Sequence, residues 1–315
     1  MSKITREKIM EHPEQKKVSN DHMYYTSPRS VLRVVRSEST QDGEGVSLNR
    51  SFPNNYVSEI DPFLLLDEMG PMDIRPGGQK GFPNHPHRGF ETVTYLIEGK
   101  FEHEDSHGHA GTISAGDVQW MTAGSGVIHS EMPEKEFSRK GGRLHGFQLW
   151  VNLPKANKMM EPRYQEIPSS KIPTVTTKDG KITVKIIAGE SLGAKAIINT
   201  ITPIMYLHFK LKPNAKITQP VPKEYNAFAY VVRGEGLFGQ RNNNKIVERG
   251  NLVVFDNDGK DVYVQSTSAS KEPFELLLIG GVPLREPIAR YGPFVMNTQQ
   301  EIIQAIEDYR NGRLG

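Results

Sequence analysis

The sequence predicts an all-β protein, built from two similar β-barrels stacked in tandem and followed by one C-terminal α-helix. First, 29 glycines and 21 prolines supply many turns, which is typical of all-β proteins. Second, short strand-like runs alternate with turn residues in the first half of the chain, and the same pattern returns in the second half. Third, a length of 315 residues accommodates two domains of ordinary size.

The overall composition is that of a globular protein and excludes several classes of function. Hydrophobic residues make up 36% and charged residues 24% of the chain, and the net charge is +2. So small a net charge gives no electrostatic reason to expect direct binding to nucleic acid or to a membrane surface. Cysteine is absent, which excludes disulfides, cysteine nucleophiles and zinc fingers. Any metal must therefore be held by histidine and carboxylate side chains.

Residues 1–29 are predicted to form an N-terminal extension. The stretch from Met1 to about Asp21 is polar and charged, without the apolar core of a secretory signal or a membrane span. We therefore expect a solvated extension on a cytoplasmic protein, or on a nuclear one if the source is eukaryotic. We expect the protein to be a monomer.

The first barrel is expected over residues 30–155. Its strand-like runs include residues 90–97 and 118–121, and glycine-containing corners at 115–117 and 123–126 punctuate this region. Many short strands with such corners are typical of a barrel or a sandwich. A polar stretch with prolines, about residues 154–173, is typical of a linker.

The second barrel is expected over residues 165–290, since a weak internal repeat relates it to the first. Residues 95–99 (YLIEG) correspond to 230–234 (YVVRG), and residues 116–120 (GDVQW) correspond to 250–254 (GNLVV). The two markers lie 17 positions apart in the first half and 16 in the second. A repeat of this kind indicates two similar domains.

Residues 291–315 are expected to contain a C-terminal helix of about three turns. Thr298 and Glu301 form a capping box at its start, and Asn311-Gly312 ends it. An apolar face at helical spacing follows the cap and consists of Ile302, Ile303, Ile306 and Tyr309. We expect this face to pack on the outside of the first barrel.

The strongest candidate site consists of two short pairs, His85-x-His87 and His129-x-Glu131. In a β-strand, residues i and i+2 point to the same face, so each pair aims two side chains into one cavity. Two such pairs on neighbouring strands predict a four-ligand metal site, with donors that suit Fe, Mn, Ni, Cu or Zn. Glu91 is a competing carboxylate, either as a fourth ligand or as a residue that orients an imidazole.

The second repeat lacks all four ligand types. Counting from the repeat markers, the positions of His85, His87, His129 and Glu131 are taken by Pro220, Pro222, Tyr263 and Gln265. Only the first barrel is therefore expected to hold a metal.

The other histidines have less support as ligands. His103, His107 and His109 lie in a stretch rich in turn residues, which favours a solvated surface hairpin. His145 and Gln148 alternate with apolar residues, so they either point into the metal cavity or line the barrel.

Longer strings around the candidate ligands are similar to the signature of the pirin family, in the cupin superfamily. They are residues 82–95 (FPNHPHRGFETVTY), 116–124 (GDVQWMTAG) and 129–133 (HSEMP), with further matches at 149–154 and 292–298. The resemblance covers nearly the whole chain from about Ser30.

The resemblance implies a bicupin, that is two stacked cupin barrels, with one iron in the N-terminal barrel. Its ligand pattern places the metal on His85, His87, His129 and Glu131. It gives Glu91 a supporting or structural role instead.

The resemblance further implies quercetin 2,3-dioxygenase activity, in which Fe(II) or another divalent transition metal acts with O2 to open the ring of a flavonol or a related enol. Glu131 is then the candidate general base for the enol proton. Phe90, Trp120, Met121 and Phe147 are candidate apolar walls of the substrate pocket, although packing in a core is the commoner role for any one of them.

Two other functions remain open at this point. The first is a non-enzymatic, iron-dependent redox-sensing regulator that binds a partner protein such as a transcription factor. The second is an isomerase-type cupin with Zn or Ni, which metal analysis of the natively purified protein would reveal.

Overall fold

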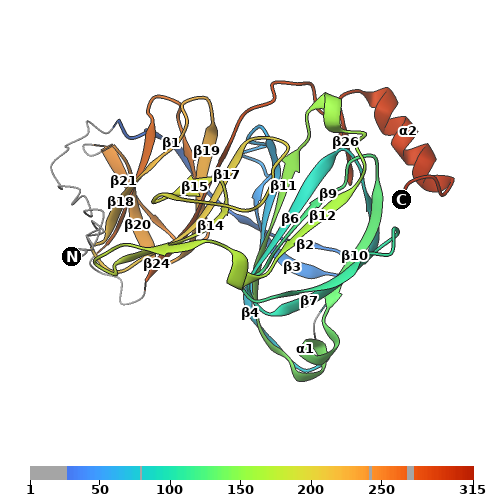
Figure 1. Cartoon of the computed structure of the whole chain (residues 1–315), viewed down its shortest axis with the longest axis horizontal. Coiled ribbons are helices and arrows are strands. Elements are labelled where there is room, and N and C mark those ends of the chain that lie inside the picture. Colours follow the sequence, from blue (N-terminus) through green and yellow to red (C-terminus); the bar gives the residue numbers. More distant parts are fainter. Residues whose placement is uncertain (1–26, 79, 241–242, 268–272) are drawn as a thin grey trace, which may run out of the picture.

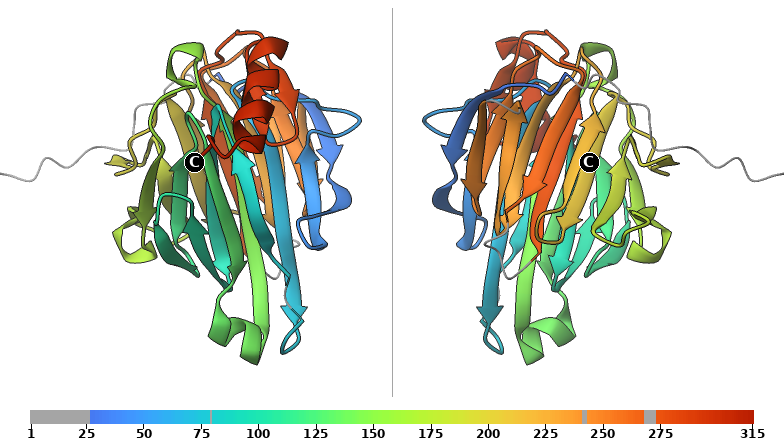
Figure 2. Two further views of the ribbon diagram at one scale, coloured as in Figure 1. Left: turned by 90° about the vertical axis from the view of Figure 1, so that its right-hand side faces the viewer. Right: turned by 90° about the vertical axis from the view of Figure 1, so that its left-hand side faces the viewer.

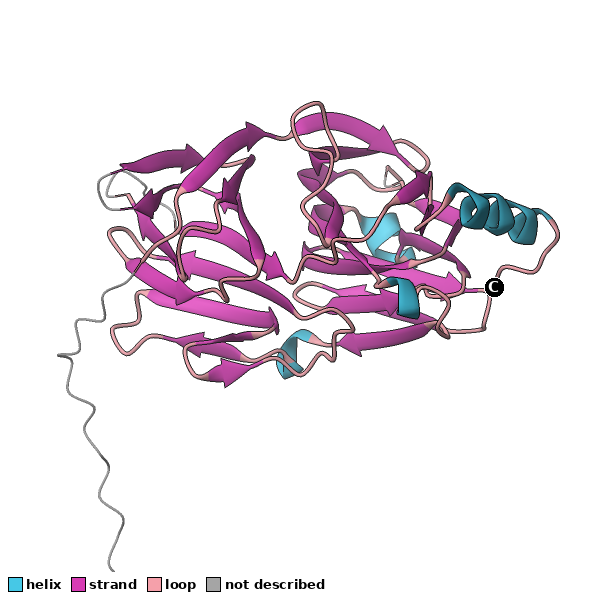
Figure 3. Cartoon of the chain, turned by 90° about the horizontal axis from the view of Figure 1, so that it is seen from above, coloured by secondary structure: helices cyan, strands magenta, loops and turns pink. Residues whose placement is uncertain are grey.

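The computed structural model describes residues 27–78, 80–240, 243–267 and 273–315. Two β-barrels lie side by side along the longest axis of the molecule, with one long helix at the outer end of the first (Figure 1). Seen from above, strands form nearly all of both barrels (Figure 3). The prediction of an all-β fold with two barrels and a C-terminal helix is confirmed.

The first barrel consists of a seven-stranded sheet, in the order β12-β9-β6-β11-β4-β3-β2, and a four-stranded sheet, in the order β5-β10-β7-β8. The strands are β2 (Glu38–Asp42), β3 (Val46–Phe52), β4 (Phe63–Ile74), β5 (Phe82–His87), β6 (Phe90–Glu98), β7 (Lys100–Asp105), β8 (Ala110–Ser114), β9 (Val118–Thr122), β10 (Val127–Pro133), β11 (Gly142–Asn152) and β12 (Arg163–Ile167). The short helices are α1 (Lys135–Lys140), η1 (Lys155–Asn157) and η2 (Ser169–Lys171).

The second barrel repeats this plan. Its seven-stranded sheet has the order β1-β22-β19-β24-β17-β14-β13, its four-stranded sheet has the order β18-β23-β20-β21, and β15-β16 is a small hairpin. The strands are β1 (Val31–Arg36), β13 (Thr174–Thr176), β14 (Ile182–Ala188), β15 (Glu190–Ser191), β16 (Ala194–Lys195), β17 (Ile204–Leu211), β18 (Lys216–Pro220), β19 (Asn226–Arg233), β20 (Glu235–Gln240), β21 (Asn243–Glu248), β22 (Asn251–Phe255), β23 (Asp261–Ser266) and β24 (Phe274–Gly281).

Each large sheet is completed by a strand from the other half of the sequence. β1 pairs with β22 in the second barrel, with Val34 opposite Val253. β12 pairs with β9 in the first barrel, with Gln165 opposite Trp120. Residues 31–36 therefore lie outside the first barrel and residues 163–167 within it, unlike the expected ranges 30–155 and 165–290. Those ranges assumed that consecutive strands are neighbours, whereas an open sheet edge can pair with any strand that reaches it.

The three largest apolar clusters form the main cores of the fold. Between the barrels, Val93 and Tyr95 of β6 pack in one cluster with Phe228 of β19 and Leu277 of β24. The opposite face of β6 sends Leu96 into the core of the first barrel, and the second barrel has a separate core of its own. Because both faces of β6 are buried, its sequence lacks the clean alternation of a half-exposed strand.

The strand ladders correct the register of the internal repeat. β5 and β10 pair His85 with His129, whereas β18 and β23 pair Thr218 with Tyr263. If Tyr263 takes the place of His129, then Thr218 takes the place of His85, and Pro220 that of His87. The connection between β18 and β19 is longer than that between β5 and β6, so counting back along the chain misplaced these equivalents.

The C-terminal helix α2 (Gln299–Arg310) lies at the outer end of the first barrel (Figure 2). It packs on a hairpin of β25 (Ala289–Tyr291) and β26 (Phe294–Met296). The expected capping box is present, since Thr298 and Glu301 each accept a hydrogen bond from the backbone N–H of the other. An ion pair of 2.8 Å between Arg88 and Asp308 joins the helix to the loop that follows β5.

The buried face of α2 is narrower than predicted. Ile302 and Ala305 are buried against the hairpin, but Ile303 and Tyr309 are 48% and 41% exposed. A two-stranded hairpin is too narrow to cover a full apolar face. No helix in the described part of the chain is long and apolar enough to cross a membrane.

Candidate metal centre

Three imidazoles converge where β5 and β10 lie side by side. His85 and His87 come from β5 and His129 from β10, and a ligand atom of each lies within 4.8 Å of the others. The ring centroids are 4.4–5.0 Å apart. Two features bring them together: residues i and i+2 of a strand share a face, and the pairing of β5 with β10 sets His85 directly opposite His129.

Burial keeps two of these imidazoles, those of His87 and His129, neutral. His87 and His129 are 2% and 1% exposed. Burial, together with the nearby histidines, holds the pKa of His87 well below its usual value, and burial lowers the pKa of His129 to about 4. Each ring therefore keeps a lone pair available at neutral pH, which is the form that binds metals.

The hydrogen bonds of the three rings fit a metal site. The Nδ1 atom of His85 lies 2.8 Å from the carbonyl oxygen of Pro83, so it carries the proton and leaves the Nε2 lone pair free. Within the described residues, Nδ1 of His87 and both ring nitrogens of His129 are buried without a hydrogen-bond partner. Buried polar atoms are rarely left unpaired, and a metal ion is a partner that would satisfy one ring nitrogen of each histidine. The residues therefore fit a divalent transition metal.

Glu131 lies beside this group but is not part of it. It is buried on the same side of β10 as His129, and its charge raises the pKa of that histidine against the larger effect of burial. Its Oε1 atom accepts a hydrogen bond of 2.8 Å from the Thr94 hydroxyl. Its Oε2 atom accepts one of 2.9 Å from the Gln148 amide. The structure thus brings together three of the four predicted ligands and holds the fourth adjacent to them.

Glu91 faces away from the imidazoles, toward the interface between the barrels. It shares a face of β6 with Val93, which packs in the inter-barrel core. Its Oε1 atom accepts a hydrogen bond of 2.6 Å from the Thr122 hydroxyl, and burial raises the pKa of its carboxyl group. Glu91 is therefore placed for a structural role.

His145 and Gln148 lie on the same strand, β11, but they have different surroundings. Gln148 contacts Glu131 beside the imidazoles. His145 instead lies 2.9 Å from Glu68, which also accepts a hydrogen bond from Tyr230 of the second barrel. Only Gln148 thus belongs to the site.

The expectation of a solvated surface cluster is wrong for His103. His107 and His109 are exposed in the turn between β7 and β8, but His103 is 3% exposed and stacks on Tyr164. The alternation of β7 explains this, because His103 shares the inward face with Phe101.

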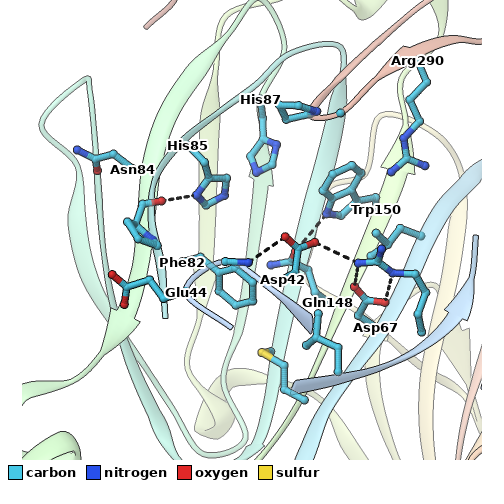
Figure 4. A pocket seen from close by; sticks show the side chains of 18 residues that line it. Asp42, Glu44, Asp67, Phe82, Asn84, His85, His87, Gln148, Trp150 and Arg290 are labelled. Atoms are coloured by element: carbon cyan, nitrogen blue, oxygen red, sulfur yellow. Dashed lines mark hydrogen bonds and ion pairs between the residues drawn. The ribbon is translucent and has the colours of Figure 1, made fainter. Parts of the chain in front are cut away.

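A cavity of about 530 Å³ opens beside His85 and His87, and Figure 4 shows both rings at its edge. None of the four candidate apolar walls lines it, and all four instead pack in apolar clusters, which is the alternative given for each of them. Trp120 and Phe147 belong to the inter-barrel core, and Phe90 and Met121 to other apolar clusters. Because the large sheet is buried on both faces, apolar residue type does not reveal which face meets the cavity. The apolar lining is instead Leu48, Leu65, Met69, Phe82 and Trp150.

The polar lining of the cavity includes residues that were not predicted from the sequence to lie at the site. Arg50 makes a two-point contact with Asp67, at 2.9 and 2.7 Å. Trp150 stands between His87 and Arg290, with its ring 5.3 Å from the His87 ring and 5.0 Å from the Arg290 guanidinium carbon. Because Trp150 lies two residues after Gln148 on β11, the alternation of the strand would have predicted that both face the cavity. Arg290 lies far along the chain and gives no such signal.

Comparison with known proteins agrees with this architecture. The Pirin family model matches residues 45–151, and the Pirin C-terminal cupin domain matches residues 206–315. The chain is 46% identical over 291 residues to the "Pirin-like protein" of Solanum lycopersicum, which covers 92% of this chain and 94% of that protein. It is 46% identical to the "Pirin" of Homo sapiens, covering 92% and 95% of the two chains. A crystal structure titled quercetin 2,3-dioxygenase, from Acinetobacter baumannii, superimposes with a TM-score of 0.85 and 36% identity, covering 92% and 99% of the two chains.

Proposed function

Since the chain belongs to the pirin family, we propose that it is a metal-dependent dioxygenase of the quercetin 2,3-dioxygenase type, using Fe(II) and O2 to cleave the ring of a flavonol or a related enol. One observation carries the proposal. Three imidazoles converge beside a cavity of about 530 Å³, which is an ordinary size for a small-molecule site. The likeness to the protein titled quercetin 2,3-dioxygenase supports the reaction type.

In this proposal His85, His87 and His129 hold the metal, with Glu131 as the fourth ligand. Imidazole nitrogen and carboxylate oxygen are a donor set that accepts several first-row divalent ions. A bound Fe(II) ion would supply the Lewis acidity that lowers the pKa of the substrate's enol hydroxyl, and the redox chemistry toward O2.

Glu131 is also the residue proposed to take the enol proton, at one of its carboxylate oxygens. A chain of hydrogen bonds fixes this carboxylate. The indole N–H of Trp150 donates to Oε1 of Gln148 at 3.1 Å, and the amide of Gln148 donates to Glu131 at 2.9 Å. The Thr94 hydroxyl holds the other oxygen. Gln148 and Thr94 are therefore positioning residues.

Turnover of quercetin by protein loaded with Fe(II) tests the proposal. The protein is reconstituted under anaerobic conditions and then mixed with quercetin and air, while flavonol absorbance and dissolved O2 are followed. We expect many turnovers per iron, with O2 consumed in proportion to flavonol. His87→Ala should abolish this, and His107→Ala, in the exposed turn, should not. Loss of flavonol that His87→Ala leaves unchanged would contradict the proposal, and iron binding without turnover would favour a non-enzymatic regulator.

A further inference from the structure

Arg290 presents a positive charge in the cavity beside the imidazoles. It lies on β25, lines the same cavity as His85 and His87, and is partly exposed. Its guanidinium carbon is 5.0 Å from the centroid of the Trp150 ring, and the His87 ring approaches the same indole at 5.3 Å. Figure 4 shows Trp150 between the two. The cation and the metal-binding edge of the cavity are thus separated by about one aromatic side chain.

The guanidinium of Arg290 has most of its hydrogen-bonding capacity free. Among the described residues it forms no ion pair with a carboxylate, and its one hydrogen bond runs from Nη1 to the backbone oxygen of Leu64, at 3.2 Å. A guanidinium offers five N–H donors in a planar fork. Arg50, the other arginine of the cavity, is engaged by Asp67 and Asp42. Arg290 is therefore the arginine that a ligand can engage.

The charge of Asp67, the acidic residue of the cavity that acts most strongly on Arg290, leaves room for an anion there. Asp67 is paired at two points with Arg50, so its charge is largely compensated. Burial, followed by the charge of Arg50, lowers the pKa of Arg290, as expected for a cation with incomplete compensation. An arriving carboxylate would supply the missing charge and two acceptor oxygens.

We propose that the ligand of this cavity carries a carboxylate at the end opposite its metal-chelating oxygens, and that Arg290 binds this carboxylate through its guanidinium fork. The ligand class is then a small aromatic enol acid. An uncharged flavonol would leave Arg290 unpaired. This inference rests on the proposed function, because it takes the three imidazoles as the metal-binding end of the site. A two-point contact with a carboxylate requires arginine, since lysine offers only a point charge.

Kojic acid and comenic acid provide a matched pair of probes. Both present the same hydroxy-ketone chelating unit on a pyranone ring, and across the ring kojic acid has a hydroxymethyl group where comenic acid has a carboxylate. Binding of each to protein loaded with Ni(II), which is stable in air, is measured by isothermal titration calorimetry, with metal-free protein as reference. We expect comenic acid to bind at least about tenfold more tightly than kojic acid, which is a typical gain from a charge-assisted hydrogen-bonded pair.

Variants identify the residue responsible for this preference. Arg290→Gln should reduce it to less than about threefold, and Arg290→Lys should restore part of it. Kojic acid should bind Arg290→Gln as it binds the unmodified protein, which shows that the metal site is intact. Arg139→Gln makes the same change in net charge on the exposed helix α1 and should leave the preference unchanged.

The outcomes separate this inference from the proposed function. Equal, metal-dependent binding of both probes would support the metal site but contradict the proposed role of Arg290. A preference that persists in Arg290→Gln overturns it as well, because another group must then hold the carboxylate. If neither probe binds the metal-loaded protein, the chelating function of the site fails, and the inference fails with it.

Discussion

The side-chain amide of Gln148 on β11 donates a hydrogen bond of 2.9 Å to the carboxylate of Glu131 on β10. This bond joins the two sheets of the first barrel beside the three imidazoles. Gln148 also accepts the indole N–H of Trp150, so one side chain links the cavity wall to the candidate base. The orientation of Glu131 is therefore determined by residues of another strand.

Gln148→Leu is expected to slow turnover while leaving the metal in place. The change keeps the size of the side chain roughly constant but removes the donor to Glu131, so the carboxylate loses one of its two hydrogen bonds. We expect kcat for quercetin to fall by about tenfold, which corresponds to about 1.4 kcal/mol, with KM changed much less. Iron content, measured by elemental analysis, should stay at the level of the unmodified protein. Gln300→Leu, at an exposed position of α2, is the matched control, and an equal loss in both variants would rule out a positioning role.

Metal binding is expected to stabilise the fold. A ligand that binds only the folded state, at a concentration of about 100 times its Kd, adds about 2.7 kcal/mol to the free energy of unfolding. Loading with Fe(II) or Ni(II) should therefore raise Tm by roughly 3–5 °C for a chain of this length, as followed by differential scanning calorimetry with and without chelator.

His129→Ala should abolish this rise, because His129 is one of the three converging imidazoles. His109→Ala, which changes an exposed histidine in the turn after β7, should preserve it. An identical Tm for the metal-loaded and chelator-treated protein would argue against the three imidazoles as a metal site.

The pairing of β1 with β22 of the second barrel is expected to contribute to the free energy of unfolding. Val35 is 7% exposed and belongs to the inter-barrel core, whereas Val34 next to it is 38% exposed. Val35→Asp would bury an unpaired carboxylate and should cost about 2–4 kcal/mol of unfolding free energy. Val34→Asp should cost less than about 0.5 kcal/mol.

Hydrogen exchange locates the effect of Val35→Asp. Since β1 pairs with β22, protection should decrease in β22 and β19 of the second barrel. Decreased protection confined to β2 and β3, which follow β1 in the sequence, would contradict the pairing.

Some side-chain positions in the site follow from the alternation of residues along one strand, and these could be predicted from the sequence. Others depend on contacts between distant segments, and these could not. The convergence of His85 and His87 follows from their spacing on one strand, and the same parity explains why His103 is buried beside Phe101. The carboxylate of Glu131 could not be placed in this way, because its orientation depends on Gln148 from another strand.

The same contrast between local signals and long-range contacts applies to the fold. The turns, the repeat and the capping box are local signals, and they predicted two barrels and α2 correctly. Sheet membership of β1 and β12 is set by pairing between distant segments, which residue type alone does not specify. The arrival of Arg290 at the cavity likewise depends on how the connection after β24 returns to the first barrel.

Glu275 on β24 is expected to make the stability of the protein depend on pH in the acidic range. It is buried, lies 3.3 Å from both His208 and Lys210, and His208 in turn contacts Tyr95 of the first barrel at 2.8 Å. Burial alone would raise the pKa of Glu275, but the hydrogen bond from His208 and the positive charges around it lower the pKa to about 2. The network therefore favours the ionised carboxylate in the folded state.

A carboxylate whose pKa is lower in the folded than in the unfolded state stabilises the fold above the unfolded pKa, and this contribution is lost as the pH falls through the folded pKa. The usual glutamate pKa of 4.5 and the folded value of about 2 define that range. Urea unfolding of the unmodified protein and of Glu275→Gln should therefore differ by on the order of 2 kcal/mol at pH 6. The difference should shrink steadily between pH 4.5 and 2. Glu248→Gln, which removes an exposed carboxylate, is the control and should show no such trend. A difference for Glu275→Gln that is independent of pH would mean that the charge of Glu275 is not what stabilises the contact between the barrels.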